Sequence, residues 1–159
     1  MAAAARVLVV DDDALTLAMV SQVLSCQGYE VLPASGPRQA LEIVRTPPPV
    51  QLILSDVEMP EMRGTQLVSE VLQLSPQTAA LLMTGGVRPP DVPEGVAVVR
   101  KPFSTAELIL AVRSTLARSA VLSARMGELA ERNKRLRSEL QEAVENSIGT
   151  LRQSSDKPR

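Results

Sequence analysis

Residues 52–64, with the sequence LILSDVEMPEMRG, decide the fold of this chain. The segment opens on a short, largely apolar run that ends directly in Asp56. Such a run is typical of a buried parallel strand whose carboxyl end opens at a polar site. Pro60 and Gly64 interrupt the pattern and predict a loop after the strand. The stretch therefore places a carboxylate at the end of an internal strand.

The same pattern of strand followed by helix repeats on both sides of this stretch. Parallel strands that alternate with helices form a sheet covered on both faces. We therefore expect a doubly wound, flavodoxin-like α/β domain over residues 5–118, with a five-stranded parallel sheet in the order 2-1-3-4-5. The expected strands are residues 6–10, 29–32, 51–55, 79–83 and 96–99, and the expected helices are 14–27, 38–45, 65–74 and a last helix introduced by Ser104.

The interval between the fourth and fifth strands departs from this alternation. Residues 85–100, GGVRPPDVPEGVAVVR, contain three prolines and three glycines. Proline lacks the amide hydrogen and clashes with the preceding turn of a helix. The interval predicts a loop, or at most a single turn, where a fourth helix would stand.

Residues 104–153 contain no proline and show no strand pattern. From Leu122 to Ala143 apolar residues recur at the first and fourth positions of a heptad, which predicts a coiled coil over residues 119–153 and a homodimer. Asn133 at an "a" position favours two parallel strands in register, whereas a single solvated helix is the alternative. We expect residues 154–159 to be disordered. The "d" positions are Leu108, Thr115, Leu122, Leu129, Leu136 and Ala143, and the "a" positions are Val112, Ser119, Met126, Asn133, Leu140 and Ser147.

The composition excludes several classes of function. The chain of 159 residues has no histidine, which rules out Ser-His catalysis, histidine-bound metals and an internal phosphohistidine. Cys26 is the single cysteine, and we expect it on a buried helix face. The N-terminal apolar run is too short for a signal peptide or a membrane span, so we expect a cytoplasmic protein without membrane contact.

The charge is divided unevenly along the chain. The net charge is −1, but residues 1–103 hold 7 basic and 11 acidic side chains, and residues 104–159 hold 10 basic and 7 acidic. The basic run at residues 132–137 alternates with glutamates and has no aromatic neighbour, which indicates a solvated helix face rather than a DNA-binding surface. The output is therefore expected to pass to an unidentified partner or effector domain.

Polar residues stand at the carboxyl ends of four expected strands: Asp11 and Asp12, then Asp56, Thr84 and Lys101. In a doubly wound sheet these ends meet at one edge. Three carboxylates brought together repel one another. A divalent cation such as Mg²⁺, which takes carboxylate, carbonyl and phosphate oxygens, relieves that repulsion. Asp56 would then be the nucleophile of a phosphoryl transfer, with Thr84 and Lys101 donating to the phosphoryl oxygens.

At this point the chain resembles bacterial response-regulator receiver domains, of the CheY-like kind. The resemblance covers about residues 5–118, and its second motif is highly specific. It rests on VLVVDDD at residues 7–13, LILSDVEMPEMRG at 52–64, LLMTGG at 81–86 and VVRKPF at 98–103.

The resemblance implies a role for each matching residue. Asp56 would be the phosphoacceptor, Asp11 and Asp12 the acidic pair that holds Mg²⁺, and the backbone carbonyl of Glu58 a further metal ligand. Lys101 would contact the phosphoryl group and join Pro102 through a cis peptide.

Thr84 would be the hydroxyl that moves towards the phosphate, and Asp13 an N-cap. The phosphoryl donor would be a sensor histidine kinase, a phosphotransfer protein or a small acyl phosphate. The domain would catalyse its own phosphorylation and dephosphorylation without being an enzyme in the usual sense.

Two departures from the family pattern concern how the signal leaves the site. Val98 stands where the family usually carries an aromatic residue, and the regular fourth helix is missing. We therefore hypothesise that activation changes the orientation or pairing of the long helix after Ser104.

Two alternatives remain beside this interpretation. A phosphatase of the haloacid-dehalogenase type would use Asp11 as nucleophile, but it needs an acidic pair beyond Lys101, where only a helix follows. A receiver-like dimerisation scaffold would keep the fold without regulation by phosphorylation. The cost of burying three carboxylates argues against that scaffold.

Overall fold

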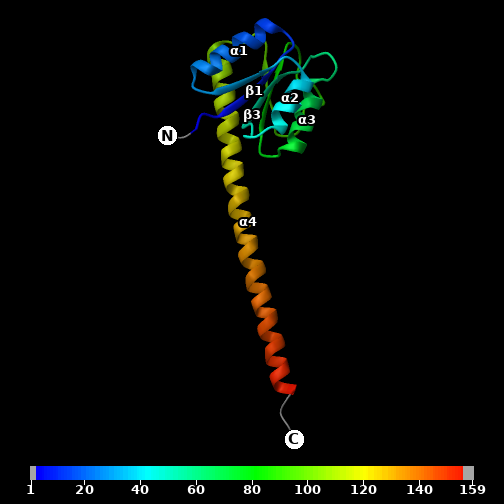
Figure 1. The fold of residues 1–159 in the computed structure, drawn as a ribbon, viewed down its shortest axis with the longest axis vertical. Coiled ribbons are helices and arrows are strands. Elements are labelled where there is room, and N and C mark those ends of the chain that lie inside the picture. Colours follow the sequence, from blue (N-terminus) through cyan, green and yellow to red (C-terminus); the bar gives the residue numbers. More distant parts are fainter. Residues whose placement is uncertain (1–2, 156–159) are drawn as a thin grey trace. The chain divides into compact units, whose positions relative to one another are not determined.

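The computed structural model describes residues 3–155 and divides the chain into two compact units, residues 1–120 and 121–159. The first unit is a parallel five-stranded sheet in the order β2-β1-β3-β4-β5, which confirms the predicted fold (Figure 1). The domain boundaries stay a prediction. The strands are β1 (Arg6–Val10), β2 (Glu30–Ala34), β3 (Leu52–Asp56), β4 (Ala79–Thr84) and β5 (Ala97–Arg100), and the helices are α1 (Ala14–Cys26), α2 (Pro37–Arg45), α3 (Gly64–Leu74) and α4 (Thr105–Ser155).

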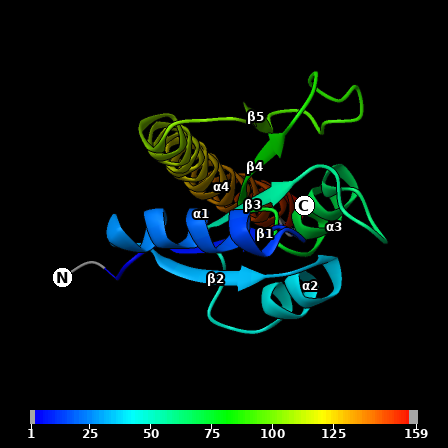
Figure 2. The same cartoon turned by 90° about the horizontal axis from the view of Figure 1, so that it is seen from above.

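Two aliphatic cores, one on each face of the sheet, hold the first unit together. The helices α2 and α3 cover one face, and α1 and the first turns of α4 cover the other (Figure 2). Buried side chains of these helices belong to the core on their own face. Both faces of β3 and β4 are covered, so every residue of these two strands is buried. This burial explains their continuous apolar sequences, because a strand covered on both faces has no solvated side.

Local sequence signals set the ends of α1. The carboxylate of Asp13 accepts hydrogen bonds from Thr16 N at 3.0 Å and Thr16 Oγ1 at 2.5 Å, so the predicted N-cap is confirmed. Both hydrogen bonds lower the pKa of Asp13, and the one from the Thr16 side chain has the larger effect. Gly28 follows the helix with φ +87, a left-handed conformation that glycine adopts at little cost.

The prediction that Cys26 is buried is wrong. The thiol is exposed at the last residue of α1, and the buried stripe of this helix consists of Val20 and Leu24. Successive residues of a helix are about 100° apart, so Cys26 lies on the far side from Leu24. Leu15 and Met19 also belong to the exposed side, with exposed fractions of 81% and 50%.

The segment between β4 and β5 contains no helix, as its prolines predict. Its side chains enter the core instead: Pro89 and Val96 are buried, and Val92 packs against the core cluster to which α2 and α3 contribute. The helix-free segment therefore fills the place that a fourth helix would occupy over β4 and β5.

The second unit contains residues 121–155 of α4, and its described large apolar side chains are all exposed within this single chain. The helix includes Ser154 and Ser155, two residues beyond the predicted end of the coil, and residues 156–159 lie outside the described part. The homodimer remains a prediction. The exposed residues are Val121, Leu122, Met126, Leu129, Leu136, Leu140, Val144, Ile148 and Leu151.

Candidate functional site

Three carboxylates meet where β1 and β3 end. Asp11 and Asp12 follow β1, and Asp56 is the last residue of β3. One oxygen from each lies within 4.8 Å of the others, and Asp11 and Asp56 are buried whereas Asp12 is exposed. The neighbouring parallel strands bring them together, since β1 pairs with β3 up to Val10 and Ser55.

Lys101 lies between two of these carboxylates. Its Nζ atom is 3.0 Å from Asp56 Oδ1 and 3.1 Å from Asp11 Oδ2. Burial disfavours the ammonium charge, but hydrogen bonds to Asp56 and Asp11, together with their negative charges, raise the pKa of Lys101 above its usual value. The lysine is therefore positively charged at neutral pH and neutralises part of the acidic cluster.

The cluster also changes the acidity of Asp56. Burial of the carboxylate raises its pKa, and the charges of Asp11 and Asp12 act in the same direction, against the hydrogen bond from Lys101. Burial and nearby like charges both disfavour an ionised carboxyl. A divalent cation held by the three carboxylates would remove this penalty, so the donor set fits Mg²⁺.

Thr84 ends β4 next to the strand that carries Asp56. Its side chain is buried, and its Oγ1 atom accepts a hydrogen bond from Gly86 N at 3.2 Å. Its carbonyl accepts a hydrogen bond from Lys101 N at 2.7 Å, which fixes the lysine at the end of β5. The Lys101-Pro102 peptide is cis, as the family resemblance implies.

Gly64, which the sequence predicts only as a loop residue, is a structural residue of the site. A β-carbon at this position would overlap the carbonyl oxygen of Asp56, and Gly64 N donates to Val57 O at 2.9 Å. Only glycine allows the start of α3 to approach the backbone of Asp56 this closely. The signal in the sequence is a glycine that ends a loop and begins a helix, eight residues after the acid.

The predicted role of Glu58 concerns its backbone carbonyl and stays a proposal. Its side chain is exposed and pairs with Arg63 at 3.4 Å. Val98 lies in β5, where it pairs with Leu82 and packs against the core. Because the residue is a valine, this position has no aromatic side chain that could rotate.

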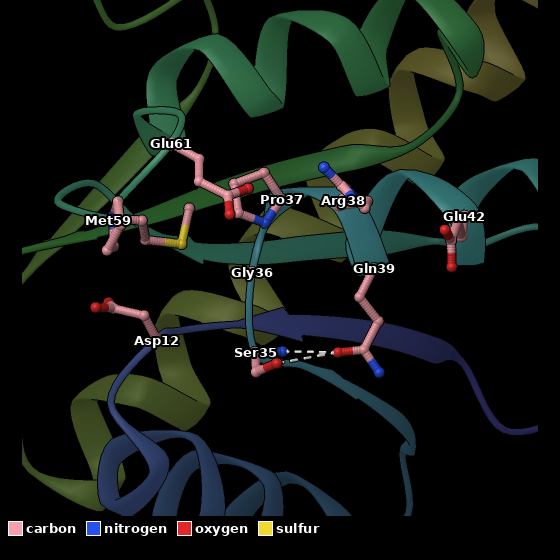
Figure 3. Close-up of a pocket in the computed structure, with 10 residues that line it drawn as sticks. Asp12, Ser35, Gly36, Pro37, Arg38, Gln39, Glu42, Met59 and Glu61 are labelled. Atoms are coloured by element: carbon pink, nitrogen blue, oxygen red, sulfur yellow. Dashed lines mark hydrogen bonds between the residues drawn. The ribbon is translucent and has the colours of Figure 1, made fainter.

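A pocket of about 430 Å³ lies beside Asp12, between the start of α2 and the loop after β3 (Figure 3). Gln39 Oε1 accepts hydrogen bonds from Ser35 N at 2.9 Å and Ser35 Oγ at 3.3 Å on its wall. Met59 and Glu61 face the pocket from the opposite side. Of the three carboxylates of the acidic site, Asp12 is the one that lines this pocket.

Residues 7–113 match the model of the response regulator receiver domain. The transcriptional regulatory protein PdtaR of Mycobacterium tuberculosis (strain CDC 1551 / Oshkosh) is 31% identical over 153 residues, which are 92% of this chain and 72% of that protein. The transcriptional regulatory protein CpxR of Klebsiella pneumoniae is 31% identical over 119 residues, which are 72% of this chain and 50% of that protein.

Solved structures show the same likeness. A CheY-like receiver domain protein of Methanospirillum hungatei aligns with a TM-score of 0.67 and 26% identity, covering 74% of this chain and 97% of that one. The chemotaxis protein CheY4 of Vibrio cholerae aligns with a TM-score of 0.65 and 32% identity, covering 71% and 99%. The chain belongs to the response-regulator receiver domain family, whose members are signalling domains. Within residues 3–155, no helix is both long and apolar enough to span a membrane.

Proposed function

We propose that this receiver accepts a phosphoryl group on Asp56 from a partner histidine kinase or phosphotransfer protein, in a reaction that needs Mg²⁺. The observation that carries the proposal is the contact of Lys101 with both Asp56 and Asp11 inside a cluster of three carboxylates. This arrangement gives Asp56 and Asp11 a shared cationic partner, and the three carboxylates together supply oxygen ligands for a metal.

The residues divide the chemistry between them. An oxygen of Asp56 forms the new bond to phosphorus while the bond from phosphorus to the donor's imidazole nitrogen breaks, and the imidazole takes up a proton. Asp11, Asp12, Asp56 and the carbonyl of Glu58 would hold Mg²⁺, which neutralises charge on the phosphoryl oxygens when bound. Lys101 and the hydroxyl of Thr84 donate hydrogen bonds to the same oxygens.

An exposed apolar surface supports docking of the donor protein. Leu15 and Met19 lie one turn apart on α1, a helix that begins directly after the acidic pair. Exposed apolar side chains at such spacing fit a helix of a partner protein. A donor on this surface would bring its phosphohistidine close to Asp56.

Phosphorylation by acetyl phosphate tests the proposal. The full chain with Mg²⁺ should incorporate phosphate, and chelation of Mg²⁺ or the Asp56→Asn substitution should remove it. A haloacid-dehalogenase-type phosphatase would still trap phosphate on Asp11 in the Asp56→Asn variant. A dimerisation scaffold would incorporate no phosphate in any of these samples. Either of these two results would overturn the proposal.

We further propose that residues 121–155 form a parallel two-stranded coiled coil with a second copy of the chain. Exposed Leu122, Met126, Leu129, Leu136 and Leu140 occupy consecutive "a" and "d" positions around Asn133, the residue type that specifies two strands in register. Pairing would remove these apolar side chains from water, at roughly 25 cal/mol per Å² buried.

Disulfide trapping tests this orientation. Cys26 is exposed, so it is first replaced by serine. In that background Ala143→Cys, at a "d" position, should cross-link two chains on oxidation, because "d" residues of a parallel coil face each other. Ser138→Cys, on the outer face of the same helix, is the matched control. Equal cross-linking of both variants, or of neither, would overturn the parallel dimer.

The output would pass from this dimer to an unidentified partner, in the cytoplasm and without DNA contact by this chain. PdtaR and CpxR are named as transcriptional regulatory proteins. A role in regulating gene expression through a partner is therefore the first to examine.

A further inference from the structure

Two arginines lie on either side of the apolar stripe of α4. In the heptads of residues 122–143, Arg132 is the "g" residue before Asn133, and Arg137 is the "e" residue after Leu136. Both arginine side chains are exposed, and within residues 3–155 neither forms an ion pair. The polar layer at Asn133 is therefore bordered by uncompensated positive charge.

The helix itself supplies little negative charge to this region. Residues 125–137 hold five basic and two acidic side chains. Residues three and four positions apart are neighbours on a helix, and no such neighbour of Arg137 is acidic. These neighbours are Asn133, Lys134, Leu140 and Gln141. Compensation of the positive charge has to come from water or from a second helix.

A second copy of the chain brings the same charge to these positions. In a parallel two-stranded coil, a "g" residue faces the "e" residue of the next heptad on the other helix. Arg132 of one chain thus faces Arg137 of the other, and the two-fold symmetry repeats this contact on the opposite flank. The "g" and "e" contacts on either side contain Ala130 or Val144, so they add no compensating ion pair. Two like-charged contacts therefore oppose the self-pairing that the apolar residues favour.

We propose that the apolar stripe of residues 122–143 pairs in preference with a helix of a partner protein that carries acidic residues at both flanking positions. The inference rests on the proposed parallel coil and names the chemistry of the partner. Carboxylates opposite Arg132 and Arg137 replace two repulsive contacts by two ion pairs. The apolar "a" and "d" residues drive the pairing, and the flanking charges select the helix.

A charge-reversed copy of the full chain serves as the probe for such a helix. Arg132→Glu and Arg137→Glu are combined in a chain with a mass tag, which is mixed with the unchanged chain. Native mass spectrometry after subunit exchange measures hetero-pairs and self-pairs. Their ratio should exceed that of random mixing at least roughly threefold, because both flanking contacts attract in the hetero-pair and repel in either self-pair.

The matched control is a tagged chain with Arg125→Glu and Arg135→Glu. It has the same change of charge on the same helix, but Arg125 faces Ala130 of the other chain and Arg135 lies at an outer "c" position. The control should mix with the unchanged chain almost at random. Equal preference for both tagged chains would show a general attraction of opposite charges and would overturn the selection by Arg132 and Arg137.

The single variant Arg132→Glu gives an independent measurement. In its self-pair the new glutamate faces Arg137 on both flanks. The dimer dissociation constant from sedimentation equilibrium should therefore fall roughly three- to tenfold. A constant that stays the same or rises would show that positions 132 and 137 do not face each other, which contradicts the inference.

The mixing experiment also separates the inference from the coil on which it rests. Random mixing of the charge-reversed chain, with self-pairs present, removes the acidic partner helix and leaves the proposed coil. Absence of pairs of every kind removes the proposed coil and the partner helix together.

Discussion

At the scale of single residues, Gly64 shows how closely α3 packs against the backbone of Asp56. The first turn of α3 rests on the carbonyl of Asp56, and a β-carbon there would overlap backbone atoms that cannot rotate away. We expect Gly64→Ala to lower the free energy of unfolding by about 1–3 kcal/mol, the usual cost of overpacking. Urea unfolding measures the change.

Gly36→Ala is the matched control for Gly64→Ala. A β-carbon added at Gly36 would meet no atom within 4 Å, and the backbone of Gly36 is extended. Equal stability of the two variants would show that α3 can withdraw from Asp56 at no cost.

Lys101 makes the second prediction at this scale. Its ammonium lies between Asp56 and Asp11, so its removal leaves two buried carboxylates without a cation. We expect Lys101→Met to lower stability in the absence of Mg²⁺ by about 1–3 kcal/mol, less than for a fully buried pair because the lysine is partly solvated.

Adding Mg²⁺ should stabilise Lys101→Met more than the unchanged protein, as measured by thermal unfolding against Mg²⁺ concentration. The reason is that the cation meets an uncompensated charge cluster in the variant. A smaller Mg²⁺ effect in the variant would contradict the placement of the metal at these carboxylates.

At the scale of elements, the start of α4 is fixed by a reciprocal cap. Ser104 N donates to Glu107 Oε2 at 2.6 Å, and Glu107 N donates to Ser104 Oγ at 3.2 Å. We expect Ser104→Ala to cost about 1 kcal/mol of stability, the typical value of an N-cap. Chemical denaturation of the variant measures this loss.

The same cap predicts a pH dependence. Hydrogen bonds with Ser104 lower the pKa of Glu107 below its ordinary value of 4.5. The bond with the Ser104 backbone has the largest effect, and the bond with the Ser104 side chain has the second largest. A lowered folded-state pKa stabilises the fold above pH 4.5, and this stabilisation is lost as the pH falls through the lowered pKa.

Glu107→Gln should therefore be less stable than the unchanged protein at neutral pH, and the difference should shrink below pH 4.5. Glu128→Gln, an exposed glutamate of the same helix outside the cap, should show no such trend. A difference for Glu107→Gln that grows towards acid pH would contradict the assignment.

At the scale of the whole molecule, the question is whether phosphorylation alters pairing of the chains. The apolar residues of 121–155 are exposed in the single chain, so their burial between two copies would supply the driving force for the proposed dimer. We expect Mg²⁺ and beryllofluoride to shift the dimer dissociation constant or the exchange protection of α4. Sedimentation equilibrium and hydrogen exchange measure these two quantities.

Leu129→Glu is a suitable reference for that experiment, because a charge at a "d" position weakens a coil whatever the state of Asp56. If beryllofluoride changes neither quantity in the unchanged protein, activation does not act through α4.

The sequence alone determined the sheet, its strand order and the five residues that gather at its edge. The carboxyl ends of the strands in a doubly wound sheet meet at one edge. The sequence therefore predicts that Asp11, Asp56 and Lys101 lie close together. The missing fourth helix also followed from the sequence, since three prolines within residues 89–93 forbid it.

Only the tertiary structure decided contacts that depend on distances between separate elements. The approach of Gly64 to Asp56, the hydrogen bond from Thr65 to Asp91 and the exposure of Cys26 all follow from how helices pack on the sheet. No local pattern encodes such contacts, because a side chain's partner 26 residues away is set by the fold and not by its neighbours in sequence. The sequence located the acidic site, and packing decided which contacts the surrounding segments make with it.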